Sequence, residues 1–227
     1  MGKLIYWFLH TWLLVMRQIG WFRWSVAGLE QLPARTSGGM IIAMNHVNWM
    51  DIPVIGTLLP LRYRLSWLGK SELFARPFGN WFFSTMQVIP VKRGKRDLAA
   101  IESVVDALRG GAVLLIFPEG TRSRSGVLRE GRGGAVRMAL QANVPIVPVA
   151  VIGTEHGLGG SLRRKPVHLQ IGQAYMPEAA ADDGSNVVHM KQLTDELMSR
   201  IALLLPVERR GLYAQLAAAQ AQPETTA

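Results

Sequence analysis

A chain of 227 residues can bury one substantial hydrophobic core, so we expect a single folded domain. A formal net charge of +9 and a mean hydropathy of +0.16 suit contact with an anionic membrane surface, although a basic charge alone would suit nucleic acid equally well. The chain has no cysteine, which excludes disulfides, cysteine-ligated zinc and thiol nucleophiles.

The first 24 residues contain four of the seven tryptophans: Trp7, Trp12, Trp21 and Trp24. An apolar run extends from residue 4 to residue 16, and Arg17 ends it. A helix of that length reaches about 20 Å, whereas the hydrocarbon core of a bilayer is about 30 Å thick. We therefore expect residues 1–24 to form a membrane-associating helical segment that lies in one leaflet. A tilted full span, a helix of the core and a cleaved signal peptide are the alternatives.

Downstream, strand-like and helix-like patterns alternate. Short apolar runs predict strands at 39–44, 63–68, 88–91, 112–117, 146–152 and 167–171. Helical spacing of apolar residues predicts helices at 51–59, 77–86, 97–109, 131–142 and 187–205. This alternation predicts an α/β domain over residues 25–210, with a mixed β-sheet flanked by helices. Residues 211–227 are expected to form a mobile tail.

The first motif with chemical content is NHVNWMD at residues 45–51. His46 can take a proton from a hydroxyl near neutral pH if a carboxylate holds its second ring nitrogen. Asp51 can fold back to do so if the chain turns into a helix between them. We expect Asn45 either to contact the substrate hydroxyl that accepts the transferred group or to have a structural role. The alternative is a buried histidine at a helix start, capped by Asp51, without chemistry.

The second motif is FPEGTRS at residues 117–123, which follows an apolar run. Such a turn can expose backbone N–H groups, so Gly120, Thr121 and Arg122 are candidates for binding a phosphate group. Glu119 would repel an anion there unless it binds a hydroxyl, pairs with Arg122 or serves the structure. The alternative is an ordinary turn with solvated charges.

A third segment, VIPVKR at residues 88–93, places Arg93 at the exit of a predicted strand, where sites of α/β proteins gather. The basic run that follows could also be a solvated face. The sequence contains no Gly-x-Ser-x-Gly elbow, and its other histidines lack metal-ligand spacing. Aromatic residues do not interleave the basic segments, which disfavours nucleic acid as a partner.

Taken in order, these motifs resemble those of the glycerolipid acyltransferases of the bacterial PlsC-like, 1-acylglycerol-3-phosphate acyltransferase type. The resemblance spans residues 26–151, with blocks at 45–51, 89–93, 117–123 and 144–149. It implies transfer of a fatty acyl group from acyl-CoA or acyl-carrier protein to the free hydroxyl of 1-acylglycerol-3-phosphate, giving phosphatidate, without a metal or other cofactor. It also implies an α/β domain with an N-terminal helical membrane anchor.

The resemblance assigns roles to individual residues. His46 becomes the general base, oriented by Asp51. The acceptor phosphate would be held by Arg93, Gly120, Thr121 and Arg122. Two positions depart from the family pattern: Gln87 stands where the second block often opens with glycine, and Lys92 where an acidic residue often precedes the arginine.

These departures concern recognition of the acceptor, so lyso-ornithine lipid and other lysolipids stay open as substrates. A non-catalytic phospholipid-binding protein of the membrane surface is the alternative from another class, but it gives no reason for pairing His46 with Asp51. We expect a monotopic or peripheral protein of the inner (cytoplasmic) membrane, with its catalytic domain facing the cytoplasm, where anionic lipids attract basic patches and the acyl donor is available.

Overall fold

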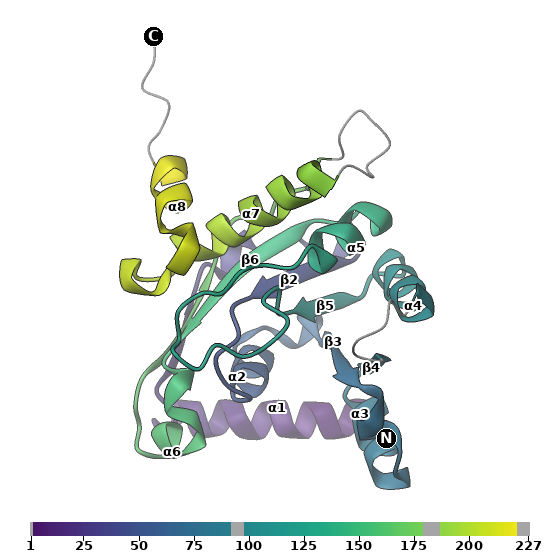
Figure 1. Ribbon diagram of the computed structural model, residues 1–227. Coiled ribbons are helices and arrows are strands. Elements are labelled where there is room, and N and C mark those ends of the chain that lie inside the picture. Colours follow the sequence, from purple (N-terminus) through teal and green to yellow (C-terminus); the bar gives the residue numbers. More distant parts are fainter. Residues whose placement is uncertain (1, 92–97, 179–186, 222–227) are drawn as a thin grey trace.

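The computed structural model describes residues 2–91, 98–178 and 187–221. Within these residues, seven strands form one sheet in the order β1-β7-β6-β2-β5-β3-β4 (Figure 1). The strands are β1 (Trp24–Ala27), β2 (Met40–Met44), β3 (Leu65–Lys70), β4 (Val88–Val91), β5 (Val113–Ile116), β6 (Ile146–Ile152) and β7 (Val167–Ile171). Neighbouring strands run parallel, except β6 and β7, which are antiparallel. The predicted mixed α/β fold is therefore confirmed.

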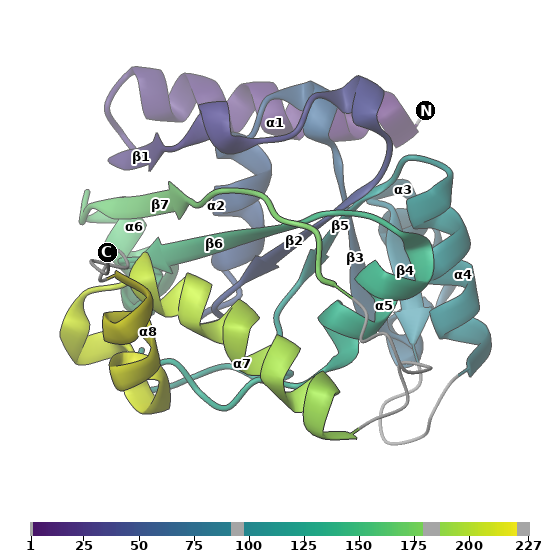
Figure 2. The same ribbon diagram turned by 90° about the horizontal axis from the view of Figure 1, so that it is seen from above.

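Helices cover both faces of this sheet (Figures 1 and 2). One face packs against α1 (Gly2–Gln18) and α2 (Asp51–Leu58), and the other against α4 (Leu98–Arg109), α5 (Gly134–Ala142) and α7 (Val187–Leu203). The shorter helices are α3 (Pro77–Thr85), α6 (Gly157–Leu162) and α8 (Ala214–Ala221). Because each face has its own apolar layer, both sides of the central strands must be hydrophobic.

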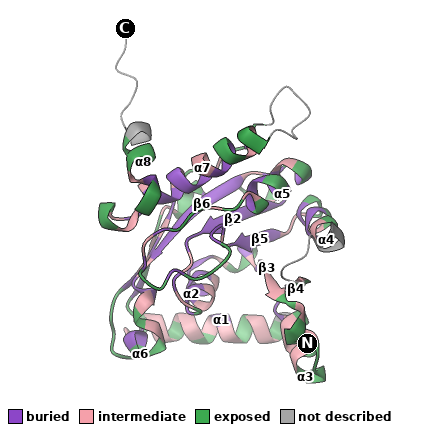
Figure 3. Ribbon diagram, in the orientation of Figure 1, coloured by how far each residue is buried: buried purple, intermediate pink, exposed green. Residues whose placement is uncertain are grey.

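Strand β2 shows how the sequence meets this requirement. All five of its residues are buried, and alternate side chains enter opposite cores. Met40, Ile42 and Met44 join the core under α2, while Ile41 and Ala43 join the core under α5 and α7. Strands β2 and β5 are accordingly purple in Figure 3, whereas α1 carries intermediate and exposed residues.

The sheet also decides where the two motifs meet. Strands β2 and β5 are parallel neighbours, with Ala43 opposite Ile116. Both carboxyl ends therefore lie at the same edge of the sheet, and the chain leaves them as the segments that begin at Asn45 and Phe117. Ligand sites of α/β sheets gather at such edges.

The start of the chain differs in part from the expected membrane segment. Trp24 opens β1, pairs with Val167 and is only 3% exposed, and Phe22 is buried beside it. These two residues belong to the core because their rings stack between the sheet and α1 rather than facing outward. None of the described helices is long and apolar enough to cross a membrane.

At the other end, the segment that we expected to be a mobile tail is helical as far as it is described. Residues 211–221 form a 3₁₀ turn (Gly211–Tyr213) and α8, which packs against α7. Tyr213 and Ala217 are buried there, and the Tyr213 hydroxyl accepts a hydrogen bond from the Gly131 N–H (2.9 Å). The C-terminal segment thus contacts the loop that follows the second motif.

Candidate active site

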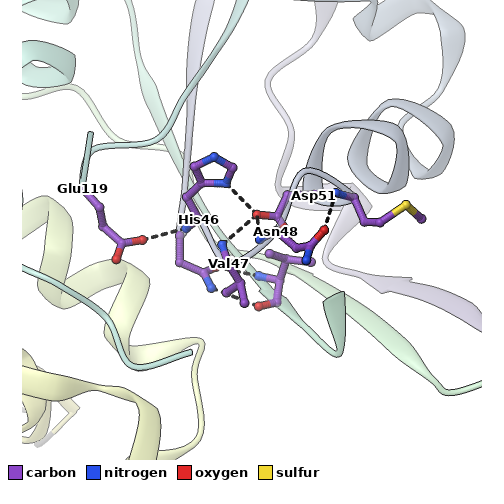
Figure 4. Close-up of polar contacts among 8 residues, drawn as sticks. His46, Val47, Asn48, Asp51 and Glu119 are labelled. Carbon is purple, nitrogen blue, oxygen red and sulfur yellow. Dashed lines mark hydrogen bonds and ion pairs between the residues drawn. The ribbon is translucent and has the colours of Figure 1, made fainter. Parts of the chain in front are cut away.

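Asp51 is the first residue of α2, and its carboxylate organises the turn between β2 and that helix (Figure 4). One oxygen, Oδ2, lies 2.7 Å from His46 Nδ1 and accepts the N–H groups of Val47 (2.8 Å) and Asn48 (3.0 Å). The side chain is fully buried. Three donors that converge on one buried oxygen hold the carboxylate in a single orientation. The expected pairing of His46 and Asp51 is therefore present.

The imidazole of His46 is held on two sides. Because a carboxylate oxygen can only accept, Nδ1 carries the proton in this bond, which leaves a lone pair on Nε2. The ring stacks on Phe117, with ring centroids 3.8 Å apart and an angle of 16° between the planes. Nε2 has no partner among the described residues, and the side chain is 13% exposed. This arrangement is that of a general base that is open to a substrate hydroxyl.

Glu119 joins the two motifs through the backbone. Its Oε1 accepts the N–H of His46 (2.6 Å) and its Oε2 accepts the N–H of Arg129 (3.0 Å), while the residue is buried. Burial raises the pKa of Glu119, and the two N–H bonds oppose this shift. Glu119 was expected to bind a hydroxyl, to pair with Arg122 or to serve the structure, and these bonds support the structural role.

Two further bonds fix the same region. The Ser123 N–H donates to the His46 carbonyl (2.7 Å), so the end of the second motif is tied to the first. Asn45 is buried and exchanges two hydrogen bonds with the Val151 backbone (3.0 and 2.7 Å). Asn45 thereby fastens the end of β2 to β6 and does not face a substrate.

The turn at residues 120–122 offers backbone donors, but not at every position. Gly120 has φ +68°, a conformation that favours glycine, and its N–H is used by the Phe117 carbonyl (2.9 Å). The N–H groups of Thr121 and Arg122, in contrast, have no acceptor within the described part of the chain. Both side chains are exposed, so these two residues remain candidates for binding an anion.

Arg132 was not among the predicted site residues, because it is one of several arginines that follow the second motif. The structure brings it to the turn: a Cβ atom at Gly120 would lie 3.0 Å from Arg132 Cδ and Nε. The Arg132 N–H donates to the Pro118 carbonyl (2.8 Å). A second cation therefore lies against the turn that carries Arg122.

Arg93 lies outside the described residues. Strand β4 ends at Val91, and its carboxyl end is at the same edge of the sheet as those of β2 and β5, since β3 pairs in parallel with both β4 and β5. Within the described ranges, no group of three or more histidine, aspartate or glutamate side chains is arranged to hold a metal ion.

A family model described as Acyltransferase matches residues 23–152, which is more than half of the chain and includes both motifs. The chain belongs to the acyltransferase family. A lyso-ornithine lipid O-acyltransferase of Pseudomonas aeruginosa is 33% identical over 203 residues, which cover 86% of this chain and 67% of the relative. A chloroplastic 1-acyl-sn-glycerol-3-phosphate acyltransferase of Arabidopsis thaliana, LPAT1, is 30% identical over 161 residues.

The length of the match differs among relatives of this acyltransferase. The alignment with the Arabidopsis protein covers 65% of this chain but only 44% of that relative. The 1-acyl-sn-glycerol-3-phosphate acyltransferase of Bacillus subtilis is 33% identical over 134 residues, which cover 59% of this chain and 64% of the relative. The crystal structure of PlsC from Thermotoga maritima superposes with a TM-score of 0.65 at 22% identity and covers 99% of this chain and 83% of that one. That likeness shows the fold.

The raised pKa of Glu119 leads to a prediction about stability. The folded protein binds this proton more tightly than the unfolded chain, so the contribution of Glu119 to stability is fully present below its ordinary pKa of 4.5. It is lost as the pH rises through the raised pKa. Glu119→Gln does not titrate, so its free energy of unfolding should rise relative to that of the unchanged protein as the pH increases from 4.5 through the raised pKa.

Urea unfolding at a series of pH values measures this difference. Glu130→Gln is the matched control, because Glu130 is exposed, and its difference from the unchanged protein should vary little with pH. A free energy of unfolding that falls for Glu119→Gln relative to the unchanged protein as the pH rises would show that the two N–H bonds outweigh burial.

Proposed function

We propose that this acyltransferase moves a fatty acyl group from acyl-CoA or acyl-carrier protein to the free hydroxyl of 1-acylglycerol-3-phosphate, giving phosphatidate. The observation that carries the proposal is the bond between His46 Nδ1 and Asp51, which leaves Nε2 free beside a turn with two unpaired N–H groups. The names of the Arabidopsis and Bacillus relatives support this choice of acceptor.

The chemistry follows from that geometry. Nε2 of His46 removes the proton of the acceptor hydroxyl while its oxygen attacks the carbonyl carbon of the donor thioester. When the tetrahedral intermediate collapses, the carbon–sulfur bond breaks and the leaving thiolate takes the proton back from the imidazolium. Asp51 stabilises the imidazolium and keeps the ring in place. Such general-base help contributes roughly 10²- to 10⁴-fold, and positioning two substrates supplies much of the rest.

The acceptor phosphate would be bound by the N–H groups of Thr121 and Arg122 and by the guanidinium group of Arg122. Arg132, which lies against Gly120, adds a second cation to this proposed phosphate-binding site. We also include Arg93 from the family resemblance. Because Ser123 is bonded to the His46 carbonyl, a phosphate bound at this turn is held at a constant distance from the base.

A second acceptor, lyso-ornithine lipid, is favoured by one observation. The Pseudomonas aeruginosa relative with that name aligns with 86% of this chain, compared with 65% for the Arabidopsis relative. Ornithine offers a carboxylate, which the same cations could bind. Assays of the purified protein with both lysolipids and both acyl donors decide between the two. A non-catalytic phospholipid-binding protein would show no turnover with any of them.

We further propose that α1 lies in the surface of the inner (cytoplasmic) membrane, with the catalytic domain on the cytoplasmic side. One side of α1 packs on α2, where His10 is buried and its Nδ1 is 3.2 Å from the Gly56 carbonyl. The opposite side exposes large apolar residues. They are Leu4, Trp7, Phe8, Trp12 and Val15. A solvent-facing apolar stripe is the reverse of what a water-soluble surface helix shows.

His46→Ala should lower kcat by about 10²- to 10⁴-fold without unfolding the protein, because no other base is placed at the turn. Asp51→Asn should cost less, since it removes the orientation of the ring and not the proton acceptor. Initial rates with each donor, together with thermal unfolding, measure both effects. His189→Ala is the control, because His189 is partly exposed on α7 and its ring nitrogen bonds to the Glu178 carbonyl. Turnover of His46→Ala close to that of the unchanged protein would refute the mechanism.

Arg122→Ala should raise the KM for the acceptor and lower kcat/KM by roughly 10- to 150-fold, the usual cost of a lost charge-assisted hydrogen bond. The KM for the acyl donor should change little. Arg137→Ala, which removes an exposed arginine on α5, should leave both constants nearly unchanged. An equal rise in the KM for donor and acceptor would instead assign Arg122 to the phosphates of the donor.

The role of α1 is tested by substitution rather than by deletion, because removing residues 1–24 would take Phe22 and Trp24 from the core. Trp7→Ser combined with Trp12→Ser should weaken vesicle binding more than tenfold, since each ring would bury on the order of 100 Å² of apolar area. Flotation with liposomes measures this. Substitution of the exposed Val207 and Leu212 by serine is the control. Equal flotation of both double variants would place the membrane contact elsewhere.

A further inference from the structure

A second basic pocket lies outside the active site, at the end of α1. It has a volume of about 540 Å³ and is bounded by the α1–β1 turn and the start of β7. Its lining includes Arg17, Gly20, Phe22, Arg23, Ser25 and Pro166. The proposed acyl transfer uses none of these residues.

Two arginines line this pocket, and a third lies over the turn beside it. Arg17 is held by a bond from its Nε to the Trp24 carbonyl (2.7 Å), and Arg23, the residue before β1, is exposed. Arg164 reaches over the turn, because a Cβ atom at Gly20 would lie 3.3 Å from its Nη2. Within the described residues, none of the three arginines forms an ion pair.

Arginines that form no ion pair and lie around one turn raise the positive potential there, and a bound anion lowers it. The C-terminal end of α1 carries a partial charge of about −0.5, which offsets only a fraction of three positive charges. The pocket is therefore electrostatically suited to a phosphate group. The Ser25 hydroxyl in its wall is already bonded to His168 Nδ1 (2.8 Å), so the arginines are the groups that would bind the phosphate.

The rim of the pocket is apolar. Ile19 is 63% exposed and Trp21 51% exposed in the turn after α1, and Leu162 of α6 is half exposed. Apolar side chains do not help to bind a soluble anion. The interface of a bilayer, in contrast, accommodates tryptophan and aliphatic groups beside basic ones. The strand that follows the α1–β1 turn contacts α6, because the Trp24 indole N–H donates to the Ser161 hydroxyl (3.4 Å).

The sheet places this pocket at the catalytic edge. Strand β1 is parallel to β7, β7 is antiparallel to β6, and β6 is parallel to β2. The start of β1 therefore lies at the same edge as the carboxyl end of β2, which leads to His46 (Figure 2). Three steps between strands separate β1 from β2, which corresponds to about 14 Å.

We propose that this pocket binds the phosphate group of an anionic phospholipid in the bilayer surface, at a site separate from the acceptor site. An apolar stripe alone lets α1 roll about its axis in the membrane. A headgroup bound at one end of the helix fixes that rotation and holds the catalytic edge against the bilayer. The inference extends the proposed membrane contact of α1 and does not depend on acyl transfer.

The test uses the full chain with Arg23→Gln and Arg164→Gln combined, and it leaves Arg17 in place because Arg17 also supports β1. Binding is measured by flotation with vesicles of phosphatidylcholine, with and without phosphatidylglycerol. Loss of two arginines near an anionic surface should weaken binding to the phosphatidylglycerol vesicles about 30-fold. Binding to pure phosphatidylcholine should not change.

The matched control removes the same charge from the other face of the sheet, with Arg109→Gln and Arg137→Gln on α4 and α5. It should weaken binding less than about threefold, because these residues would point away from the bilayer. Equal losses for both double variants would show a general effect of net charge and overturn the proposal. A second outcome would also overturn the proposal. In it, the Arg23→Gln/Arg164→Gln variant binds vesicles as the unmodified protein does, but only the unmodified protein binds inorganic phosphate.

Acyl transfer to a detergent-dispersed acceptor separates this site from the proposed function. The Arg23→Gln/Arg164→Gln variant should keep its rate in detergent and lose rate only on vesicles that contain phosphatidylglycerol. A loss of rate in detergent would place these arginines in the acceptor site and overturn the proposal. Vesicle binding that follows the expected pattern in a protein without acyl transfer would refute the proposed function alone.

Discussion

The buried carboxylate of Glu119 is the interaction on which the catalytic edge depends. It accepts one N–H from the segment after β2 and another from the loop after β5, and so spans 73 residues of sequence with a single side chain. Burial raises the pKa of the Glu119 carboxyl, and the two N–H bonds offset part of the cost of burying its charge. Together with the bond from the Ser123 N–H to the His46 carbonyl, this bridge joins the loop of His46 to the loop that carries the turn at residues 120–122.

The remaining order follows from how these loops leave the sheet. Parallel β2 and β5 deliver both loops to one edge, and Asn45 ties the first of them to β6. At the start of α2, one carboxylate oxygen of Asp51 accepts hydrogen bonds from two backbone N–H groups and from the His46 imidazole. The stacking of His46 on Phe117 links the base to the second motif a second time. Each contact removes freedom from groups that must meet a substrate in one geometry.

The two outer faces of the molecule differ in the kind of side chain that they expose. Apolar side chains on the open side of α1 and unpaired arginines at its end occupy the part of the molecule that includes the catalytic edge. The face under α4, α5 and α7 instead carries ion pairs such as Lys191 with Asp195 and Arg200 with Glu196. The proposed function requires such an asymmetry, since a site for a membrane-borne substrate opens toward the bilayer while the opposite side of the protein contacts water.

The sequence alone determined whatever depends on neighbours along the chain. Fully apolar runs predicted the central strands because both faces of the sheet are covered, and a spacing of five residues predicted the His46–Asp51 bond because a helix start brings such positions together. Only the tertiary structure decided the rest. Glu119 turned out to bond two backbone groups, Trp24 entered the core as an edge strand, and Arg164 came to lie over Gly20, because each of these contacts joins segments that only the sheet places side by side.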